Sequence, residues 1–391
     1  MELFWITVFA VTSFLVIYHH LLFPVLLKRM GQHSGSSRQM LEKLDESNLP
    51  TMTIVMPAYN EADSIRDKLL NLSVLDYPKD LLNVVIANDG SKDNTLQIIE
   101  ETLASGWCQE LNVSVINFEH NQGKTKILNK VLPNVFSEIT VMTDVSALLS
   151  IDSLKMISMS LASEKVGVVT GHYQLLSPGS DGEAVYWNYQ SQIKQNESDV
   201  HSTMGCHGAL YAFKTELFER LSEDTINDDF VIPMKIVEKG YRSIYEKDIH
   251  AVELEQSQSD QDFNRRVRIS AGNIQQVVML ISLLNPMRGK VAFTFFSGKF
   301  LRVLMPICLL LVLVSSAALS RESLFFLTLF VAQVLVYGVC TWVLISQRQP
   351  ASRVLRVVQY IFNGHLANLI GLIKFISGKQ NKTWQKSVTN N

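Results

Sequence analysis

Residues whose side chains can bind ligands or take part in catalysis follow several apolar segments of this sequence. Asp89 and Asp144 each lie just after a β-rich apolar run, and Gly123 and Lys124 lie between them in the chain. Carboxylates accept hydrogen bonds from a base or ribose and bind divalent metals, and a lysine offers positive charge to phosphate. The set therefore suits a nucleotide diphosphate. The motifs GxxxxGK[ST] and GxGxxG are both absent from the sequence, which argues against a P-loop ATPase and a dinucleotide-binding protein.

The segments that precede these residues predict a parallel sheet. Apolar, β-rich runs lie at 51–56, 82–87, 113–118 and 139–143. Each is followed by a stretch with helical spacing, and this alternation is typical of βαβ units in an α/β fold. Ligands of such sheets bind at the carboxyl ends of the strands, so the polar residues after each run should converge on one crevice.

The composition divides the chain into two parts of opposite charge. Of the 391 residues 47% are hydrophobic; the chain has 20 basic and 35 acidic residues up to residue 260, and 15 and 2 after it. An apolar, cationic C-terminal part suits the anionic cytoplasmic leaflet of a bilayer. This pattern excludes a disordered chain and a disulfide scaffold, and the four scattered cysteines, without a CxxC pair, suggest neither a metal cluster nor disulfides.

Three long apolar runs predict membrane-spanning helices, at 3–27, 300–319 and 324–345. Lys28 and Arg29 follow the first run, which indicates an uncleaved anchor with its N-terminus outside. A last run at 357–376 carries polar residues and has basic residues on both sides. It is either a spanning helix whose polar side chains face other helices or an interfacial helix that does not cross.

The predicted organisation has five parts. They are a transmembrane anchor at 1–30, a linker at 31–49, a cytosolic domain at 50–260, amphipathic interface helices at 261–290 and a C-terminal membrane region at 291–391. We expect a multi-pass protein of the cell (inner) membrane.

The ordered motifs of the sequence resemble membrane-bound glycosyltransferases of family 2, the inverting group that includes cellulose, hyaluronan and poly-N-acetylglucosamine synthases. The resemblance runs from about residue 50 to the end. The motifs are PAYNE at 57–61, NDGS at 88–91, TDVS at 143–146, NDD at 227–229 and FNRRVRI at 263–269. They imply an α/β, GT-A-like, mostly parallel sheet with flanking helices, and a transfer from a nucleotide sugar, with a UDP-sugar the expected donor.

The resemblance also implies a nucleotide site and a metal. Its expected nucleotide-binding residues are Pro57, Ala58, Tyr59, Glu61, Asp89, Lys124 and Asp144. Asp144 matches the first carboxylate of the family's DxD motif and Ser146 stands where the second often lies, so Mg²⁺ or Mn²⁺ is expected at Asp144 and Ser146. Because a hydroxyl is a weaker ligand than a carboxylate, Asp144 is the main expected ligand.

The catalytic residues implied are Asp229, Asp228 and Arg268. Spacing to Gly240-Tyr241 places the family's general base on Asp229, with Asp228 on the preceding acidic position. One carboxylate suffices to take the proton of an acceptor hydroxyl that attacks the anomeric carbon opposite the leaving diphosphate. Arg268 is expected to contact that diphosphate.

The acceptor site is expected at Gly208, Ala209 and Ile269. Ile269 stands where polysaccharide synthases carry a tryptophan that helps to hold the acceptor sugar, and Arg265 stands in place of a glutamine. Transfer of a single sugar to a lipid, as in the ceramide glucosyltransferase-like branch, is therefore an alternative to polymer synthesis. A weakly active scaffold homologue is a second alternative, suggested by Ser146 and Ile269.

Structural roles compete with these assignments. Taken alone, Asp89 and Asp144 could be turn or helix-capping residues, and Arg268 could belong to a face that meets lipid headgroups. The expected partners are a nucleotide-sugar donor, a glycan or lipid acceptor, the lipid bilayer and subunits of an export complex, with no nucleic acid.

Overall fold

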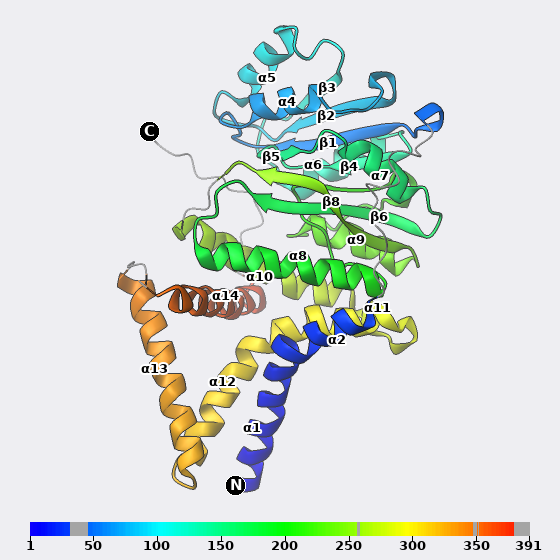
Figure 1. Ribbon diagram of the computed structural model, residues 1–391. Helices are drawn as coiled ribbons and strands as arrows, with labels where there is room; N and C mark the ends of the chain where they lie inside the picture. Colours follow the sequence, from blue (N-terminus) through cyan, green and yellow to red (C-terminus); the bar gives the residue numbers. More distant parts are fainter. Residues whose placement is uncertain (32–45, 256–258, 347–349, 351, 379–391) are drawn as a thin grey trace. The chain divides into compact units, whose positions relative to one another are not determined.

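The computed structural model describes all residues except 32–45, 256–258, 347–349, 351 and 379–391 (Figure 1). Most of the predicted linker lies outside the described residues. The described chain divides into two compact units: a sheet unit, residues 46–177 and 194–255, and a membrane unit, residues 1–30, 178–193 and 259–378. The five predicted domain boundaries stay a prediction.

The described part of the sheet unit contains an eight-stranded sheet in the order β3-β2-β1-β4-β7-β6-β8-β5. The strands are β1 (Met52–Ala58), β2 (Leu82–Asn88), β3 (Asn112–Asn117), β4 (Ile139–Met142), β5 (Ala147–Leu149), β6 (Val166–Leu175), β7 (Tyr211–Lys214) and β8 (Arg242–Glu253). β3, β2, β1 and β4 are parallel, as are β6 and β8, whereas the pairs β4-β7, β6-β7 and β5-β8 are antiparallel. The predicted GT-A-like α/β fold is confirmed, and the sheet is mixed.

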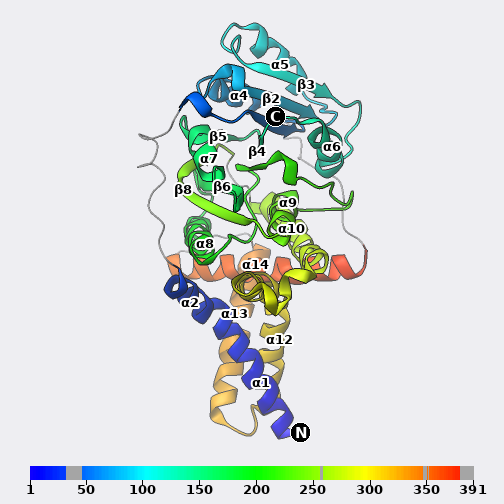
Figure 2. The same ribbon diagram turned by 90° about the vertical axis from the view of Figure 1, so that its right-hand side faces the viewer.

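Helices flank this sheet (Figures 1 and 2). They are α4 (Ile65–Ser73), α5 (Thr95–Ala104), α6 (Lys124–Val131), α7 (Ser153–Leu161), α9 (Asp228–Glu238) and α8 (Asp181–Val200), whose first residues belong to the membrane unit. All seven residues of β1 are buried, as expected for a parallel strand covered on both faces. β3 is an edge strand, and most of its side chains are exposed or half-buried.

The membrane unit is helical. Its elements are α1 (Glu2–Ile17), α2 (Phe23–Met30), α10 (Ser259–Met279), α11 (Lys290–Phe295), α12 (Leu301–Leu319), α13 (Leu324–Ser346) and α14 (Arg353–Ile376). Short π-helical turns join α1 to α2 at Tyr18–Leu22 and α11 to α12 at Phe296–Phe300. Among the described residues, three continuous helices are long and apolar enough to cross a membrane: Glu2–Met30, Lys290–Leu319 and Leu324–Ser346.

The helix α14 lies crosswise to α12 and α13 (Figure 2). Close contacts fix it within the membrane unit. A Cβ added at Gly371 would lie 2.8 Å from the backbone nitrogen of Ala271 on α10, and one added at Gly182 would lie 2.7 Å from Cβ of Tyr360. Arg356 of α14 also pairs with Asp181 at 2.7 Å. This crosswise packing favours the interfacial alternative for the last apolar segment.

Candidate active site

The loops after β1 and β2 are tied to each other by side-chain hydrogen bonds. Asn60, in the left-handed region at φ 55°, accepts from the backbone nitrogen of Lys92 at 2.8 Å, and its own nitrogen donates to Ser91 at 2.9 Å. The backbone nitrogen of Glu61 donates to Thr95 Oγ1 at 2.8 Å. Tyr59 and Glu61 therefore follow the buried Pro57 and Ala58 in a fixed conformation at the carboxyl edge of the sheet.

Asp89 is fully buried and holds a neighbouring loop. Its two carboxylate oxygens accept from the backbone nitrogens of Gln122 and Gly123, at 2.8 and 2.9 Å. The loop after β2 approaches the backbone of His120 closely at Gly90, where an added Cβ would lie 2.6 Å from the carbonyl carbon of His120. Asp89 thus positions the segment that leads into Lys124, and its contact with a nucleotide stays a prediction.

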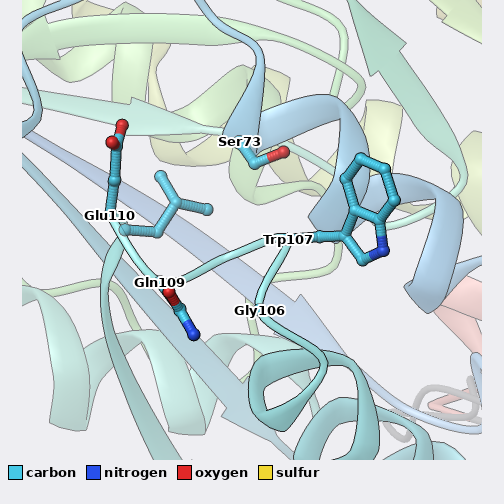
Figure 3. A pocket seen from close by; sticks show the side chains of 6 residues that line it. Ser73, Gly106, Trp107, Gln109 and Glu110 are labelled. Carbon is cyan, nitrogen blue, oxygen red and sulfur yellow. The ribbon is translucent and has the colours of Figure 1, made fainter.

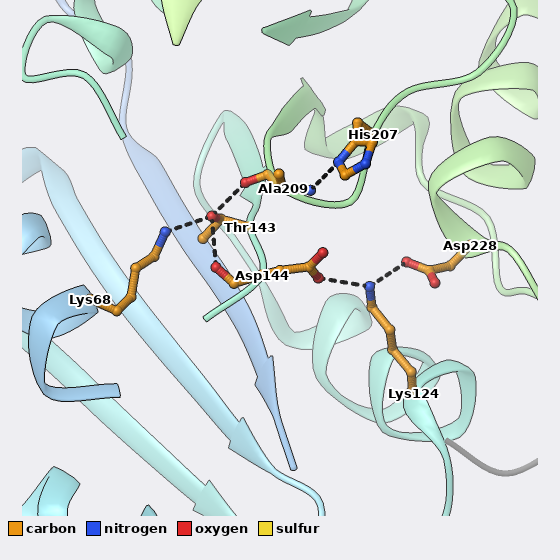
Figure 4. A network of polar contacts seen from close by, with 7 residues as sticks. All are labelled: Lys68, Lys124, Thr143, Asp144, His207, Ala209 and Asp228. Carbon is orange, nitrogen blue, oxygen red and sulfur yellow. Dashed lines mark hydrogen bonds and ion pairs between the residues drawn. The ribbon is translucent and has the colours of Figure 1, made fainter. Parts of the chain in front are cut away.

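Lys124 joins two of the predicted carboxylates (Figure 4). Its Nζ lies 3.1 Å from Oδ1 of Asp144 and 3.4 Å from Oδ2 of Asp228. Burial alone would lower the pKa of Lys124, but Asp144, Asp228 and Asp229 together raise it, so the ammonium form is retained. The structure brings together residues that lie at the end of β4, at the start of α6 and at the start of α9.

Asp229 has a pKa suited to a general base. Burial, and then the neighbouring Asp228, raise the pKa of its carboxyl from 3.8 to about 6, against the opposing charge of Lys124. An ideal catalytic base titrates near the operating pH, because it must be ionised yet still attract a proton. The backbone carbonyl of Asp229 accepts from the nitrogen of Cys206 at 3.0 Å, which fixes the start of α9 beside the segment 205–209.

The predicted acceptor residues Gly208 and Ala209 lie against Asp144. A Cβ added at Gly208 would be 2.7 Å from Oδ2 of Asp144, so a larger residue there would displace this carboxylate. The carbonyl of Ala209 accepts from the hydroxyl of Thr143 at 2.8 Å (Figure 4). The neighbouring Cys206 is buried, and burial raises the pKa of its thiol to about 12, which argues against a nucleophile.

Sequence reasoning missed Lys68, which is fully buried on α4. Its Nζ donates to Thr143 Oγ1 at 2.7 Å (Figure 4). It also donates to the carbonyl of Ala147, so its two acceptors lie on either side of Asp144 and Ser146 in the chain. Burial lowers the pKa of Lys68 to about 7, although Asp144 and Glu253 oppose the shift. A lysine at helical spacing from the apolar Ile65, Leu69 and Leu72 was the signal available in the sequence.

Glu253, at the end of β8, was also missed. It lies opposite Ala147 in the sheet, is 8% exposed and hydrogen-bonds to the side chain of Ser146. Burial, more than the charge of Asp144, raises the pKa of Glu253. The side chain of Ser146 thus meets a buried carboxyl, and its predicted contact with a metal stays a prediction. Alternation of buried residues from Ile249 to the end of β8 would have placed Glu253 on the inner face.

The remaining predicted residues, Arg268 and Ile269, lie on α10 in the membrane unit. Both side chains are half-buried, and Arg268 is two residues from the buried Ser270, which packs against Gly371 of α14. Their contacts with donor and acceptor stay predictions.

A surface pocket of about 260 Å³ lies elsewhere in the sheet unit (Figure 3). It is lined by Ser73 at the end of α4 and by residues 106–111, which precede β3. Because β3 is parallel to β1 and β2, this pocket lies at the amino edge of the sheet, away from the polar residues described above. Glu110 is the one ionisable side chain that lines it, with no second acid, base or metal ligand in the lining, so the pocket is not the candidate active site.

The mixed sheet, with carboxylates at its carboxyl edge, has the GT-A-like architecture that the sequence predicts. Residues 53–222 match the model of glycosyl transferase family 2. Residues 53–222 therefore form a family 2 glycosyltransferase domain, as the motifs within this segment predict.

Two similar proteins are named as synthases of a polysaccharide. Poly-β-1,6-N-acetyl-D-glucosamine synthase of Staphylococcus epidermidis is 25% identical over 218 residues, 54% of this chain and 51% of the relative. The synthase of the same name from Staphylococcus aureus is 26% identical over 220 residues, 54% and 52% of the two chains. The chain thus spans about half the length of these relatives.

A solved structure extends the similarity in fold. A mannosyltransferase from Pyrobaculum calidifontis, in complex with GDP-Man and Mn²⁺, superimposes with a TM-score of 0.73 at 24% identity, covering 95% of this chain and all of that one. The fold similarity therefore includes the helical membrane unit as well as the sheet unit.

Proposed function

We propose that this protein is an inverting glycosyltransferase that moves a sugar from a nucleotide sugar to an acceptor at the cytoplasmic face of a membrane. The observation that carries the proposal is the arrangement of Asp144, Lys124 and Asp228 at the carboxyl edge of the sheet, with Asp229 raised to a pKa of about 6 beside them. The domain's family and the named synthase relatives support it.

In this proposal Asp229 takes the proton of the acceptor hydroxyl. The hydroxyl oxygen then forms a bond to the anomeric carbon, and the bond from that carbon to the diphosphate breaks on the opposite face. Lys124, held as a cation by three carboxylates, offers its charge to the diphosphate, and Arg268 is proposed to do the same. The Tyr59–Glu61 loop is proposed to hold the nucleotide, with Asp89 fixing the segment before Lys124.

A divalent metal fits this site in one particular way. Among the described residues there is no group of three histidine, cysteine or acidic side chains able to hold a metal by themselves. Asp144, however, retains a partly exposed carboxylate, and Mg²⁺ is commonly bound by one or two carboxylates together with substrate phosphates. Asp144 would hold the metal, which would offset negative charge on the diphosphate.

Two acceptors are consistent with the chain. The named relatives support a growing glycan, whereas Ile269 in place of tryptophan favours the transfer of one sugar to a lipid. An indole face stacks on a sugar ring and donates a hydrogen bond, and isoleucine can do neither. Sizing of the reaction product separates the two.

The test measures release of nucleotide diphosphate by the purified full-length protein in lipid nanodiscs, against a panel of UDP- and GDP-sugars. We expect turnover with one donor, abolished by chelator and restored by Mn²⁺ or Mg²⁺. Asp229→Asn should keep nucleotide binding and lose transfer by about 10² or more.

Asp80→Asn is the matched control, because Asp80 is an exposed aspartate at Lys79–Leu81, just before the amino end of β2, and the candidate site lies at the carboxyl ends of the strands. It should retain full turnover. Absence of turnover with every donor, while the nucleotides still bind, would favour the scaffold alternative. Full turnover of Asp229→Asn would show that another residue is the base.

A further inference from the structure

Polar and cationic side chains gather within the membrane unit, outside the candidate active site. His20 and His365 contact each other edge to face with ring centroids 5.3 Å apart, and His19 lies 4.8 Å from His20. The guanidinium of Arg302 lies close enough to interact electrostatically with all three imidazoles. These four residues, from α12, α14 and the π-helical turn after α1, are called the membrane cation cluster.

The described part of the chain supplies the membrane cation cluster with no counter-charge. Arg302 is half-buried, and among the described residues no carboxylate pairs with its guanidinium and no acceptor takes a hydrogen bond from it. Ionisable residues within membrane segments are costly, and they are retained where they pair with a partner or bind a ligand. An anion is therefore the missing partner.

The backbone around the membrane cation cluster is adapted to this position. Both π-helical turns of the membrane unit meet here, since Nδ1 of His19 lies 2.8 Å from the carbonyl oxygen of Ser297 and the hydroxyls of Tyr18 and Ser297 lie 2.8 Å apart. Such turns interrupt the regular helix and occur frequently at functional sites. They place His19 and His20 beside the first turn of α12.

Asn368 of α14 adds an unsatisfied acceptor. Its Nδ2 donates to the carbonyl of Arg302 at 2.7 Å, whereas its buried Oδ1 has no partner among the described residues. The side chain is 6% exposed. A ligand whose anionic group also carries a hydroxyl, as a singly ionised phosphate monoester does, would pair with Arg302 and donate to this oxygen.

We propose that the membrane cation cluster binds the phosphate group of an anionic membrane lipid. Arg302 supplies a permanent charge and a fork of donors suited to phosphate, and His20 and His365 add donors beside it. A lipid is favoured over a soluble anion because His19, His20 and Arg302 lie within the continuous helices Glu2–Met30 and Lys290–Leu319, which are long and apolar enough to span a membrane. The proposal does not depend on the proposed transferase activity.

The experiment uses the delipidated full-length protein in a neutral detergent. Dioleoyl phosphatidic acid is added, with dioleoyl glycerol as the matched lipid without phosphate and inorganic phosphate as the soluble anion. Bound lipid is counted by native mass spectrometry, and the thermal midpoint is followed in parallel. We expect phosphatidic acid to bind and raise the midpoint, and Arg302→Gln to weaken its binding about tenfold or more.

Arg321→Gln is the control, because Arg321 is exposed in the turn after α12, at the opposite end of that helix from Arg302. It should bind phosphatidic acid as the native protein does. If Arg302→Gln fails to fold, His365→Asn serves in its place, with a smaller expected loss of binding. Equal binding by the native protein and these variants would overturn the proposal, and so would an equal response to inorganic phosphate, which would assign the site to a soluble anion.

Discussion

Gly208→Ala is expected to impair catalysis without unfolding the protein. The added Cβ would lie 2.7 Å from Oδ2 of Asp144, whereas ordinary contact begins at 3.4 Å, so the carboxylate must move by about 0.7 Å. That movement disturbs the 3.1 Å pair between Asp144 and Lys124, on which the proposed diphosphate site depends. A misplacement of 1 Å can cost about 10²-fold in rate, so we expect kcat/KM to fall by about 10- to 100-fold.

The stability of this variant should change little. The obstructing atom is the end of a side chain that is 30% exposed and able to rotate, and no backbone atom lies in the way. We expect the free energy of unfolding to change by about 1 kcal/mol or less. Steady-state turnover of the nucleotide sugar and a thermal melt, both in nanodiscs, measure the two quantities.

Gly338→Ala is the matched control, since nothing lies within 4 Å of a Cβ added there. It should leave both turnover and melting unchanged. If Gly208→Ala keeps native kcat/KM, the position of Asp144 does not limit the reaction and the proposed donor site is refuted. If it melts far below the native protein, the reasoning about the exposed carboxylate is wrong.

Four further predictions concern the titration of Asp229, the burial of Lys68, the acceptor position Ile269 and the membrane topology. Because the pKa of Asp229 is raised to about 6, turnover should rise about tenfold per pH unit up to pH 6 and level off above it, and a pH-independent rate would exclude Asp229 as the base. As the pH rises from 4 to 6, the contribution of this carboxyl to the free energy of unfolding should decline. Lys68 has a pKa of about 7 in the folded protein and 10.5 in the unfolded chain, so the free energy of unfolding of the native protein should rise from pH 7 to 10 relative to that of Lys68→Met. Urea melts at several pH values measure both, and an equal pH dependence of the two proteins would contradict the lowered pKa. Ile269→Trp should lengthen the products on a sizing gel, and long polymer from the native protein alone would show that another residue holds the acceptor. Cysteines introduced at Asp80 and Arg321 should be labelled from opposite sides of the membrane, and labelling of both from one side would disprove the predicted topology.

Local sequence patterns were sufficient to predict short elements such as the strands β1 to β4. The four β-rich runs became β1 to β4 within two residues at either end, because a buried parallel strand is a continuous apolar segment. The polar residues after these runs were also predicted to converge, and Lys124, which follows β3, lies 3.1 Å from Asp144, which follows β4. The antiparallel half of the sheet was missed, since its strands pair across long separations that no local pattern encodes.

Residues that act from beneath the site were harder to predict. Lys68 and Glu253 lie on an inner helix face and an inner strand face, where a charged residue has meaning only once its neighbours are known. The orientation of α14 could not be predicted either, because its composition suits both a spanning and an interfacial helix. The position of α14 depends on close packing at Gly182 and Gly371, and that packing involves residues far apart in sequence.

The burial of all four native thiols makes the unmodified chain a ready background for spectroscopic labelling. Cys108, Cys206, Cys308 and Cys340 are free, and each is at most 9% exposed. A bulky maleimide or methanethiosulfonate reagent would therefore react first with a cysteine introduced at the surface, without prior removal of the native ones. Pairs of spin labels or fluorophores, one on the sheet unit and one on the membrane unit, could then report the distance between the two units during turnover.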